Sequence, residues 1–412
     1  MKKTIVHLSS RYSFHGSFVS AKRFFNFFKK NKEFINIYLT GRIDEKFKGD
    51  VKRITFLHNL FSYKLFYYLD NLMNHIFHKK KSNTYWSNSR ISYFNINKIN
   101  EINNADVIIL YWVNDGFLSL KNIEDILKLG KPIIWRLSDM WPFTGGCHYS
   151  FNCKQFMSNC KSCPQLSDKY INNLSNSNFN IKKKWKLNNL SIIAPSTYLE
   201  KKVKQSYLFK NVRLKKILNS VNVNYFSPIK KKNKKLKILV GPFNHNDKER
   251  KGYDNFIKLI DHVNKKKLDV HFEIFGNYIH NDNPNIVVNN GFLNKNELRK
   301  LYAKSDIYLF LSKSDNSPNT VAESLSCGTP IVTFKNNGTE DYCINNYNSI
   351  VISKFDEIKI CNIIEKILNK KIDINNISKN ARIFAKEHFS DTAIEKNINN
   401  FVNDIIKKYG NK

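Results

Sequence analysis

Short apolar runs separated by longer amphipathic stretches dominate the first half of the chain. Each run is five or six residues long, which is the length of a buried strand rather than of a helix. The stretches between the runs repeat apolar residues with helical spacing. Strands that alternate with helices predict βαβ units and a parallel sheet. The predicted strands are residues 4–8, 106–111, 132–137 and 191–195.

A second alternation of the same kind follows a charged segment with one proline, residues 219–235, which is the best linker candidate. Helical patterns at 295–304 and 319–326 separate its later strands, and a charged amphipathic region at 376–408 closes the chain. At 412 residues the chain is too long for one ordinary core. We therefore predict an α/β protein with two consecutive Rossmann-like domains. The strands predicted for the second domain are residues 237–240, 271–275, 285–288, 307–310 and 331–333.

Composition narrows the class of protein. Apolar residues make up 42% of the chain and charged residues 25%, as in ordinary folded domains. This balance excludes a disordered chain, a collagen-like repeat and a polytopic membrane protein. No apolar run approaches the ~20 residues that cross a bilayer, and the run at 4–8 is too short for a signal peptide. We therefore expect a cytoplasmic protein.

Positive charge is concentrated in the first half of the chain. The formal net charge is +34, and residues 1–230 carry 38 Lys or Arg against 13 Asp or Glu. Residues 231–412 carry 30 against 21. A bias of the source genome toward Lys codons explains part of the excess but not its asymmetry. A positive half attracts nucleic acid, anionic lipid or phosphorylated substrates. A basic, zinc-containing nucleic-acid-binding protein is one alternative, although no helix-turn-helix, RNP-like or finger spacing appears.

The most specific motif lies in residues 312–330, where a predicted strand runs into a polar turn and then a helix. Seven residues separate its two carboxylates, Asp315 and Glu323. The first amides of that helix, at Asn319 and Thr320, form an anion site suited to a diphosphate. Asp315 can accept hydrogen bonds from sugar hydroxyls, and Glu323 from ribose hydroxyls. The plainer alternative is a helix cap and a solvated face.

The complete segment resembles the acid–seven residues–acid motif of retaining glycosyltransferases of family 4, with Asp315 where the family usually has Glu. The resemblance implies the GT-B fold, in which two Rossmann-like domains enclose a donor and acceptor cleft. It also implies that the donor is a nucleoside-diphosphate sugar, a UDP- or GDP-sugar, and that no catalytic metal takes part. Asn316 and Ser317 would then orient the donor sugar together with Asp315.

A strand, a loop and a Lys-Gly pair in the second half also resemble the family. The resemblance implies that Lys251 binds the donor diphosphate. It also implies that Lys251 and Asp315 are catalytic residues. Arg250 would assist, because Pro242 stands where the family often has an arginine after the strand glycine. Phe292 would lie beside the nucleotide base, with a packed core phenylalanine as the alternative.

In the first half, Gly16 corresponds to the glycine-rich turn that approaches the donor phosphates in the family. Residues 135–149 resemble its exopolysaccharide branch, which includes colanic acid-type transferases. That branch usually has His-Asp where this chain has Ser138 and Asp139. The resemblance gives Asp139 a catalytic role and Ser138 a sugar contact. The missing histidine leaves open a catalytically degenerate binding or scaffold subunit.

The resemblance also implies domain boundaries and a reaction. Residues 1–218 would form the acceptor domain, 219–235 the linker, 236–385 the donor domain and 386–412 a helix that packs back toward the first domain. The reaction expected is transfer of a sugar, with retention, to a lipid-linked saccharide. The product would be a surface polysaccharide, namely capsule, exopolysaccharide or the O-antigen of lipopolysaccharide. We expect no nucleic acid among the partners.

Four of the seven cysteines crowd into one short segment, in the pattern C-x5-C-x6-C-x2-C. The last pair has the spacing of thiolate zinc sites, so we predict a structural zinc site; reduced cysteines that pack in the interior are the alternative. The proposed ligands are Cys147, Cys153, Cys160 and Cys163.

Two segments, 21–32 and 61–81, mix aromatic and aliphatic residues with lysine. That composition suits helices lying on anionic lipid, and it predicts a peripheral protein at the inner face of the plasma membrane. An ordinary helix that buries its apolar face and extends its lysines into water is the alternative for each.

Overall fold

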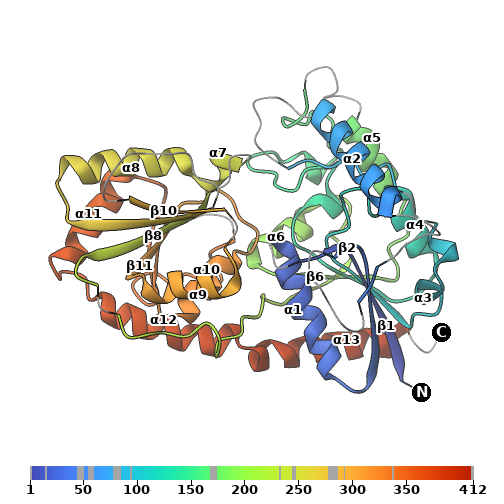
Figure 1. Cartoon of the computed structure of the whole chain (residues 1–412). Helices are drawn as coiled ribbons and strands as arrows, with labels where there is room; N and C mark the ends of the chain where they lie inside the picture. The colour runs from blue at the N-terminus through green and yellow to red at the C-terminus, as the bar shows by residue number, and fades with distance from the viewer. Residues whose placement is uncertain are drawn as a thin grey trace. The chain divides into compact units, whose positions relative to one another are not determined.

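The computed structural model describes residues 2–13, 16–43, 51–53, 60–77, 85–92, 95–167, 174–231, 233–243, 247–276, 286–291, 293–335 and 338–409. The chain divides into two compact units, which are drawn in Figure 1. The first combines Met1–Leu218 with Glu395–Lys412, and the second is Asn219–Ile394. Each unit is built on its own parallel sheet.

The sheet of the first unit has seven parallel strands in the order β3-β2-β1-β4-β5-β6-β7. The strand order reverses between β1 and β4, and the carboxyl ends of strands at such a point are where open α/β sheets bind ligands. The strands are β1 (Lys3–Tyr12), β2 (Phe34–Ile43), β3 (Val51–Arg53), β4 (Val107–Leu110), β5 (Ile133–Arg136), β6 (Leu190–Ala194) and β7 (Arg213–Lys216).

The central strands of this sheet are buried along their whole length, as continuous apolar runs predict. α4 begins with a capping box, in which Ser119 and Asn122 exchange hydrogen bonds with each other's backbone. The α-helices among the described residues are α1 (Ser17–Lys30), α2 (Leu60–Phe77), α3 (Asn100–Asn103), α4 (Leu120–Lys128), α5 (Leu174–Lys183) and α6 (Thr197–Gln205). Short 3-10 helices are η1 (Ile96–Lys98), η2 (Trp141–Phe143) and η3 (Gln155–Met157).

α1 corrects one of the two membrane predictions. The four phenylalanines of the segment 21–32 all point into the first unit, with exposed fractions of 5% or less. Phe25 and Phe28 pack against His7 of β1, with ring centroids 4.9 and 5.5 Å away. The apolar face of α1 is therefore buried against the sheet, and the segment 21–32 is an ordinary core helix with lysines at its exposed end.

The second unit has a six-stranded parallel sheet in the order β10-β9-β8-β11-β12-β13. Helices α8 and α11 lie on one face of it, and α9, α10 and α12 lie on the other (Figure 1). The strands are β8 (Leu236–Phe243), β9 (Val270–Gly276), β10 (Ile286–Asn290), β11 (Ile307–Phe310), β12 (Ile331–Phe334) and β13 (Ser349–Ile352). The helices are α7 (Lys248–Lys251), α8 (Tyr253–Lys265), α9 (Lys295–Lys304), α10 (Asn319–Ser326), α11 (Glu357–Leu368) and α12 (Ile374–Phe389).

The last helix, α13 (Asp391–Tyr409), belongs to the first unit from residue 395 onward. Its buried side chains include Ile398, Val402 and Ile405. The hydroxyl of Tyr409 donates to the carbonyl of Asn188 at 2.9 Å. Residues from 395 onward therefore pack within the same compact unit as residues before 218.

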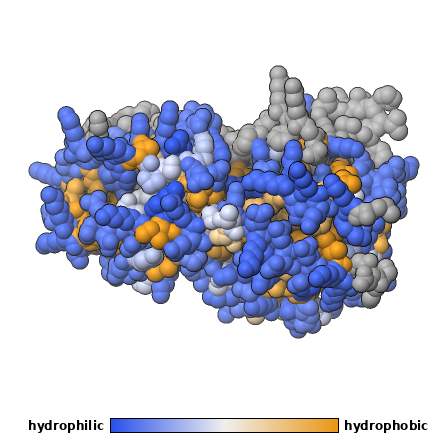
Figure 2. All heavy atoms as spheres, turned by 90° about the horizontal axis from the view of Figure 1, so that it is seen from below, coloured by the Kyte–Doolittle hydropathy of each residue, from blue (hydrophilic) through white to orange (hydrophobic). Residues whose placement is uncertain are grey.

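The surface is polar over most of the face seen in Figure 2, where apolar side chains form small separate patches. Among the described residues, no helix has the length and hydropathy to cross a bilayer.

Candidate active site

The polar turn between β11 and α10 holds the first group of predicted site residues. β8 and β11 are neighbours in the sheet, so the segments that follow their carboxyl ends meet at one edge. The segment after β8 supplies Lys251, and the segment after β11 supplies Asp315. The turn itself is held by the backbone amide of Ser317, which donates to Oδ1 of Asp315 at 3.3 Å.

Lys251 and Asp315 form an ion pair, with Nζ 3.2 Å from Oδ2 and 14% of each side chain exposed. Burial alone would raise the pKa of Asp315, but the cations of Lys251 and Arg250 outweigh burial and hold the pKa below its usual value. Burial, together with the neighbouring guanidinium, lowers the pKa of Lys251. The two side chains are therefore a buried, mutually stabilised pair of charges.

Arg250 forms hydrogen bonds to other residues of the second unit. Its Nε donates to Asp247 Oδ2 at 2.8 Å, and its Nη1 donates to the carbonyl of Ser314 at 2.9 Å. Its Nη1 is also 3.6 Å from Asp315 Oδ2. Arg250 thus ties the loop after β8 to the turn after β11, and these bonds occupy much of the guanidinium.

Side chains around the start of α10 form a second set of contacts. Asn219 donates from Nδ2 to Ser317 Oγ at 3.0 Å and to Asn319 Oδ1 at 3.2 Å. The hydroxyl of Tyr308 donates to Thr320 Oγ1 at 3.2 Å. Asn316 lies between Asp315 and Ser317 and is buried. These contacts fix the first turn of α10, whose amides have no acceptor within the helix.

Glu323 lies one turn further along α10 and is buried, with 6% of the residue exposed. Its carboxylate lies beside two buried tyrosines: burial and the nearby Glu323 raise the pKa of Tyr302, and Tyr308 is close to both Glu323 and Asp315. The structure therefore brings Glu323, Asp315 and Lys251 to the same edge of the second sheet.

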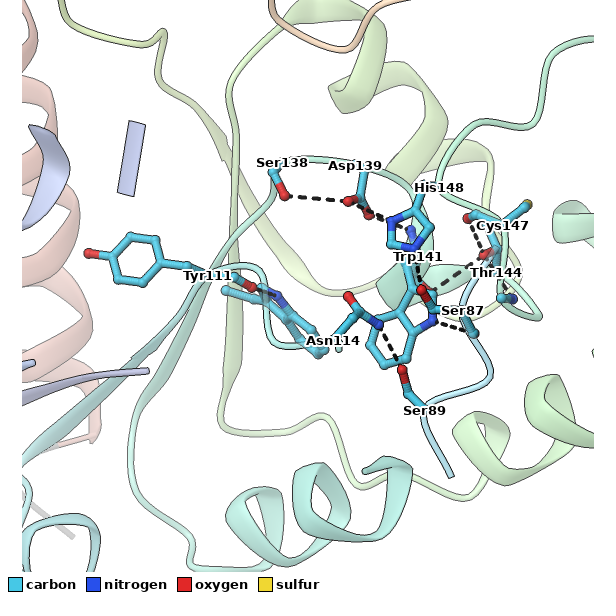
Figure 3. Close-up of polar contacts among 12 residues, drawn as sticks. Ser87, Ser89, Tyr111, Asn114, Ser138, Asp139, Trp141, Thr144, Cys147 and His148 are labelled. Carbon is cyan, nitrogen blue, oxygen red and sulfur yellow. Dashed lines mark hydrogen bonds and ion pairs between the residues drawn. The ribbon is translucent and has the colours of Figure 1, made fainter. Parts of the chain in front are cut away.

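The first unit holds the second group, around Asp139 (Figure 3). Asp139 follows β5, and its Oδ1 accepts from the amide of Trp141 at 2.9 Å. Its Oδ2 is 2.8 Å from His148 Nδ1 and 3.5 Å from Ser138 Oγ. His148 Nε2 is in turn 2.9 Å from Ser87 Oγ. Ser87, Asp139 and His148 are buried.

Sequence reasoning missed His148. The histidine stands nine positions after Asp139, and only the fold brings their side chains together. His148 donates its amide to Tyr85 O at 3.1 Å and accepts from the amide of Met140 at the same distance. The available signal was the tripeptide Cys147-His148-Tyr149, which the resemblance to the exopolysaccharide branch included.

Gly16 and Phe292 are the two remaining predicted donor contacts. Gly16 is the N-cap of α1 with φ of 55°, and a Cβ added there would meet nothing within 4 Å. The backbone angle, rather than crowding within the chain, therefore favours glycine here. Phe292 lies outside the described residues.

The four cysteines of the 147–163 segment are free thiols, and all except Cys153 are buried. Cys147 and Cys163 pack with Trp86 and Leu166, while Cys160 accepts a hydrogen bond from the amide of Gly145 at 3.2 Å. Within the described residues, which include all four, no three His, Cys, Asp or Glu side chains are grouped so that they could hold a metal ion. Packing cysteines have this arrangement as well, and the structural zinc site stays a prediction.

Comparison with known proteins places this geometry in context. The family model Glycosyl transferases group 1 matches residues 225–384. No curated protein sequence matches the chain. The family match covers the segments that carry Lys251, Asp315 and Glu323.

Several solved structures are similar over nearly the whole chain. Sucrose-phosphate synthase from Thermosynechococcus elongatus has a TM-score of 0.65 and 12% identity, and the match covers 99% of this chain and 100% of that one. A glycosyltransferase from Rickettsia africae gives 0.61 and 13%, covering 98% and 99%. Anabaena Alr3699/HepE in complex with UDP-glucose gives 0.58 and 12%, covering 97% and 99%. The chain therefore has the two-domain GT-B fold, and residues 225–384 match the family Glycosyl transferases group 1.

Proposed function

We propose that the chain is a retaining glycosyltransferase that takes a sugar from a nucleoside-diphosphate sugar. One observation carries the proposal. Lys251 and Asp315 form a buried ion pair close to the start of α10, within the segment that matches the family model. A cation beside the first amides of a helix suits a diphosphate. The Anabaena protein of similar fold was solved with UDP-glucose, which supports a nucleotide sugar as the donor, either a UDP- or a GDP-sugar.

Each side chain of the second unit has a role in this proposal. Lys251 exchanges its partner Asp315 for the donor diphosphate, and the amides of Asn319 and Thr320 bind the same group. Negative charge develops on the leaving diphosphate, and preorganised donors stabilise it there. Asp315 then accepts from the donor sugar, and Glu323 accepts from the ribose.

Asn316 and Ser317 keep the turn in place, and Arg250 ties it to the loop after β8. Because its guanidinium already binds Asp247 and Ser314, we assign Arg250 to positioning rather than to phosphate binding.

In the first unit we assign the acceptor side of the reaction to Asp139 with Ser138. His148 holds Asp139 through the 2.8 Å contact. The exopolysaccharide branch has a histidine at the position of Ser138; here His148, further along the same loop, contacts the Asp139 carboxylate instead. This contact favours an active enzyme over a degenerate binding subunit.

We further propose that the acceptor is a lipid-linked saccharide and that the product is a surface polysaccharide. The basic first half of the chain supports this, because such acceptors present phosphate groups at an anionic membrane. The protein would then work at the inner face of the plasma membrane.

Nucleotide binding tests the donor site directly. Titration calorimetry with UDP and GDP should show binding of one of them, weakened at least ~10-fold by Glu323→Ala. Glu387→Ala, which changes an exposed helical glutamate in the same unit, is the matched control and should bind as the unchanged protein does. Equal affinity of all three proteins, or binding of neither nucleotide, would contradict the proposal.

A further inference from the structure

We propose that the outward face of α2 docks on an anionic lipid bilayer. The face consists of five apolar side chains, and we call it the α2 face. The exposed fractions are 48% for Leu65, 66% for Tyr68, 37% for Leu69, 55% for Leu72 and 51% for Ile76. Their spacing of three and four residues places them on one side of the helix.

The polarity of α2 is reversed relative to an ordinary surface helix. Asp70 points inward and is 1% exposed. Asn74 also points inward: its Nδ2 donates to Asp70 Oδ2 at 3.3 Å, and its Oδ1 accepts from the amide of Asn88 at 2.8 Å. A helix that faces water normally turns its polar side outward. Here Asp70 and Asn74 bind the first unit, while the five apolar side chains of the α2 face are exposed.

α1 provides the comparison within the same unit. Its composition also mixes apolar residues with lysine, yet Phe24, Phe25, Phe27 and Phe28 are all buried. The two segments are alike in composition. The phenylalanines of α1 are buried in the first unit, whereas the side chains of the α2 face are exposed. The five side chains of the α2 face are therefore contiguous on one side of the helix rather than scattered singly over the surface.

The positive charge of the first unit indicates which partner the α2 face contacts. Lys64 is exposed on α2 itself, and residues 1–230 carry 38 Lys or Arg against 13 Asp or Glu. An apolar face accompanied by lysines is the pattern of a helix at the boundary between headgroups and acyl chains of anionic lipid. Tyr68 suits this boundary because its ring is apolar and its hydroxyl is polar.

Size argues against a protein partner. From Leu65 to Ile76 the α2 face is about 17 Å long, and a helix is about 10 Å wide. A stable protein interface covers about 800 Å² on each partner, several times the area of this face. A bilayer needs no such area, because other basic residues of the first unit add attraction to the headgroups.

The inference extends the membrane location of the proposed function and does not depend on sugar transfer. The test uses the full chain with vesicles, without donor or acceptor. Vesicles of phosphatidylcholine with phosphatidylglycerol should co-sediment the protein, and added salt should reduce binding. Vesicles of phosphatidylcholine alone should bind it less.

The variant Leu65→Gln/Leu72→Gln/Ile76→Gln should lower the partition coefficient at least ~10-fold, because three apolar side chains no longer enter the bilayer. The matched control, Ile344→Gln/Ile358→Gln/Ile383→Gln, changes three exposed isoleucines of the second unit, which are 45%, 54% and 47% exposed. It should bind as the unchanged protein does. Circular dichroism melts verify that both variants fold.

Three results would overturn the inference. The first is no binding of the unchanged protein to anionic vesicles, and the second is equal binding by both triple variants. The third is a dimer in solution that the α2 variant alone converts to a monomer, because the α2 face would then join two copies of the chain. A chain that binds vesicles but transfers no sugar would contradict only the proposed function.

Discussion

Buried carboxylates held by a cation or a ring nitrogen define the candidate site at the scale of single residues. Asp315 is paired with Lys251, and Asp139 is held by His148. The sequence predicted Asp315, Lys251 and Asp139 because they lie in recognisable segments. It did not predict His148, because its contact with Asp139 depends on how the loop after β5 folds back. It predicted a cysteine zinc site from spacing alone, and that site stays a prediction.

Replacing Lys251 tests the diphosphate role at this scale. Lys251→Met should reduce binding of nucleoside diphosphate about 10–100-fold, because a charge-assisted contact to phosphate is lost and Asp315 keeps only Arg250 to balance its charge. Lys258→Met, at an exposed lysine of α8, is the control and should leave affinity unchanged. Fluorescence or calorimetric titration measures both. Unchanged affinity in Lys251→Met would show that the phosphates bind elsewhere.

Replacing His148 separates positioning from simple packing. His148→Ala should lower kcat about 10–100-fold with little change in the KM of the donor, because Asp139 loses the contact that orients it. His148→Asn should restore most of kcat, since its amide nitrogen can take the place of Nδ1. Steady-state kinetics of both variants decide the matter. If Asn is as damaging as Ala while both proteins melt normally, the hydrogen bond to Asp139 is not what His148 contributes.

At the scale of elements, apolar runs predicted the central strands and missed polar ones. The runs at 106–111 and 132–137 are β4 and β5. β7 was not predicted, because Arg213–Lys216 is a charged edge strand without an apolar run. β2 was not predicted either, since polar residues interrupt Phe34–Ile43. The pattern gave α1 and α2 the same character, and only the folded chain distinguishes which apolar face is buried.

The buried Asp70 of α2 predicts how the stability of the protein depends on pH. Burial raises the pKa of Asp70 from 3.8 to about 6, although hydrogen bonds partly oppose it. Between these values the folded chain holds a proton that the unfolded chain has released, so this contribution to stability is lost as pH rises through 6. Asp70→Asn stays neutral throughout. Its stability relative to the unchanged protein should therefore rise by up to ~3 kcal/mol between pH 4 and 7.

Urea unfolding at a series of pH values measures this difference. Asp261→Asn, at an exposed position of α8, is the control and should run parallel to the unchanged protein. An Asp70→Asn profile that is also parallel would mean that the carboxyl group is not buried as described.

At the scale of the whole molecule, two parallel sheets follow from two runs of strand and helix separated by a charged segment. That arrangement could be predicted because each unit buries its own apolar runs in a separate core and leaves most charged side chains at the surface. The donor base, the sugar and the acceptor could not be predicted, because a few side chains in loops decide them. Net charge also acts over the whole molecule. The excess of lysine in the first half of the chain attracts anionic acceptors to that half.

The most direct test of the account is release of nucleoside diphosphate from a panel of UDP- and GDP-sugars, with and without a membrane lipid extract as acceptor. We predict release from one donor, stimulated by the extract and lost in Glu323→Ala. NMR of the product should show that the anomeric configuration of the transferred sugar is retained. No release from any donor, by folded protein that binds the nucleotide, would contradict the claim that the chain is a glycosyltransferase.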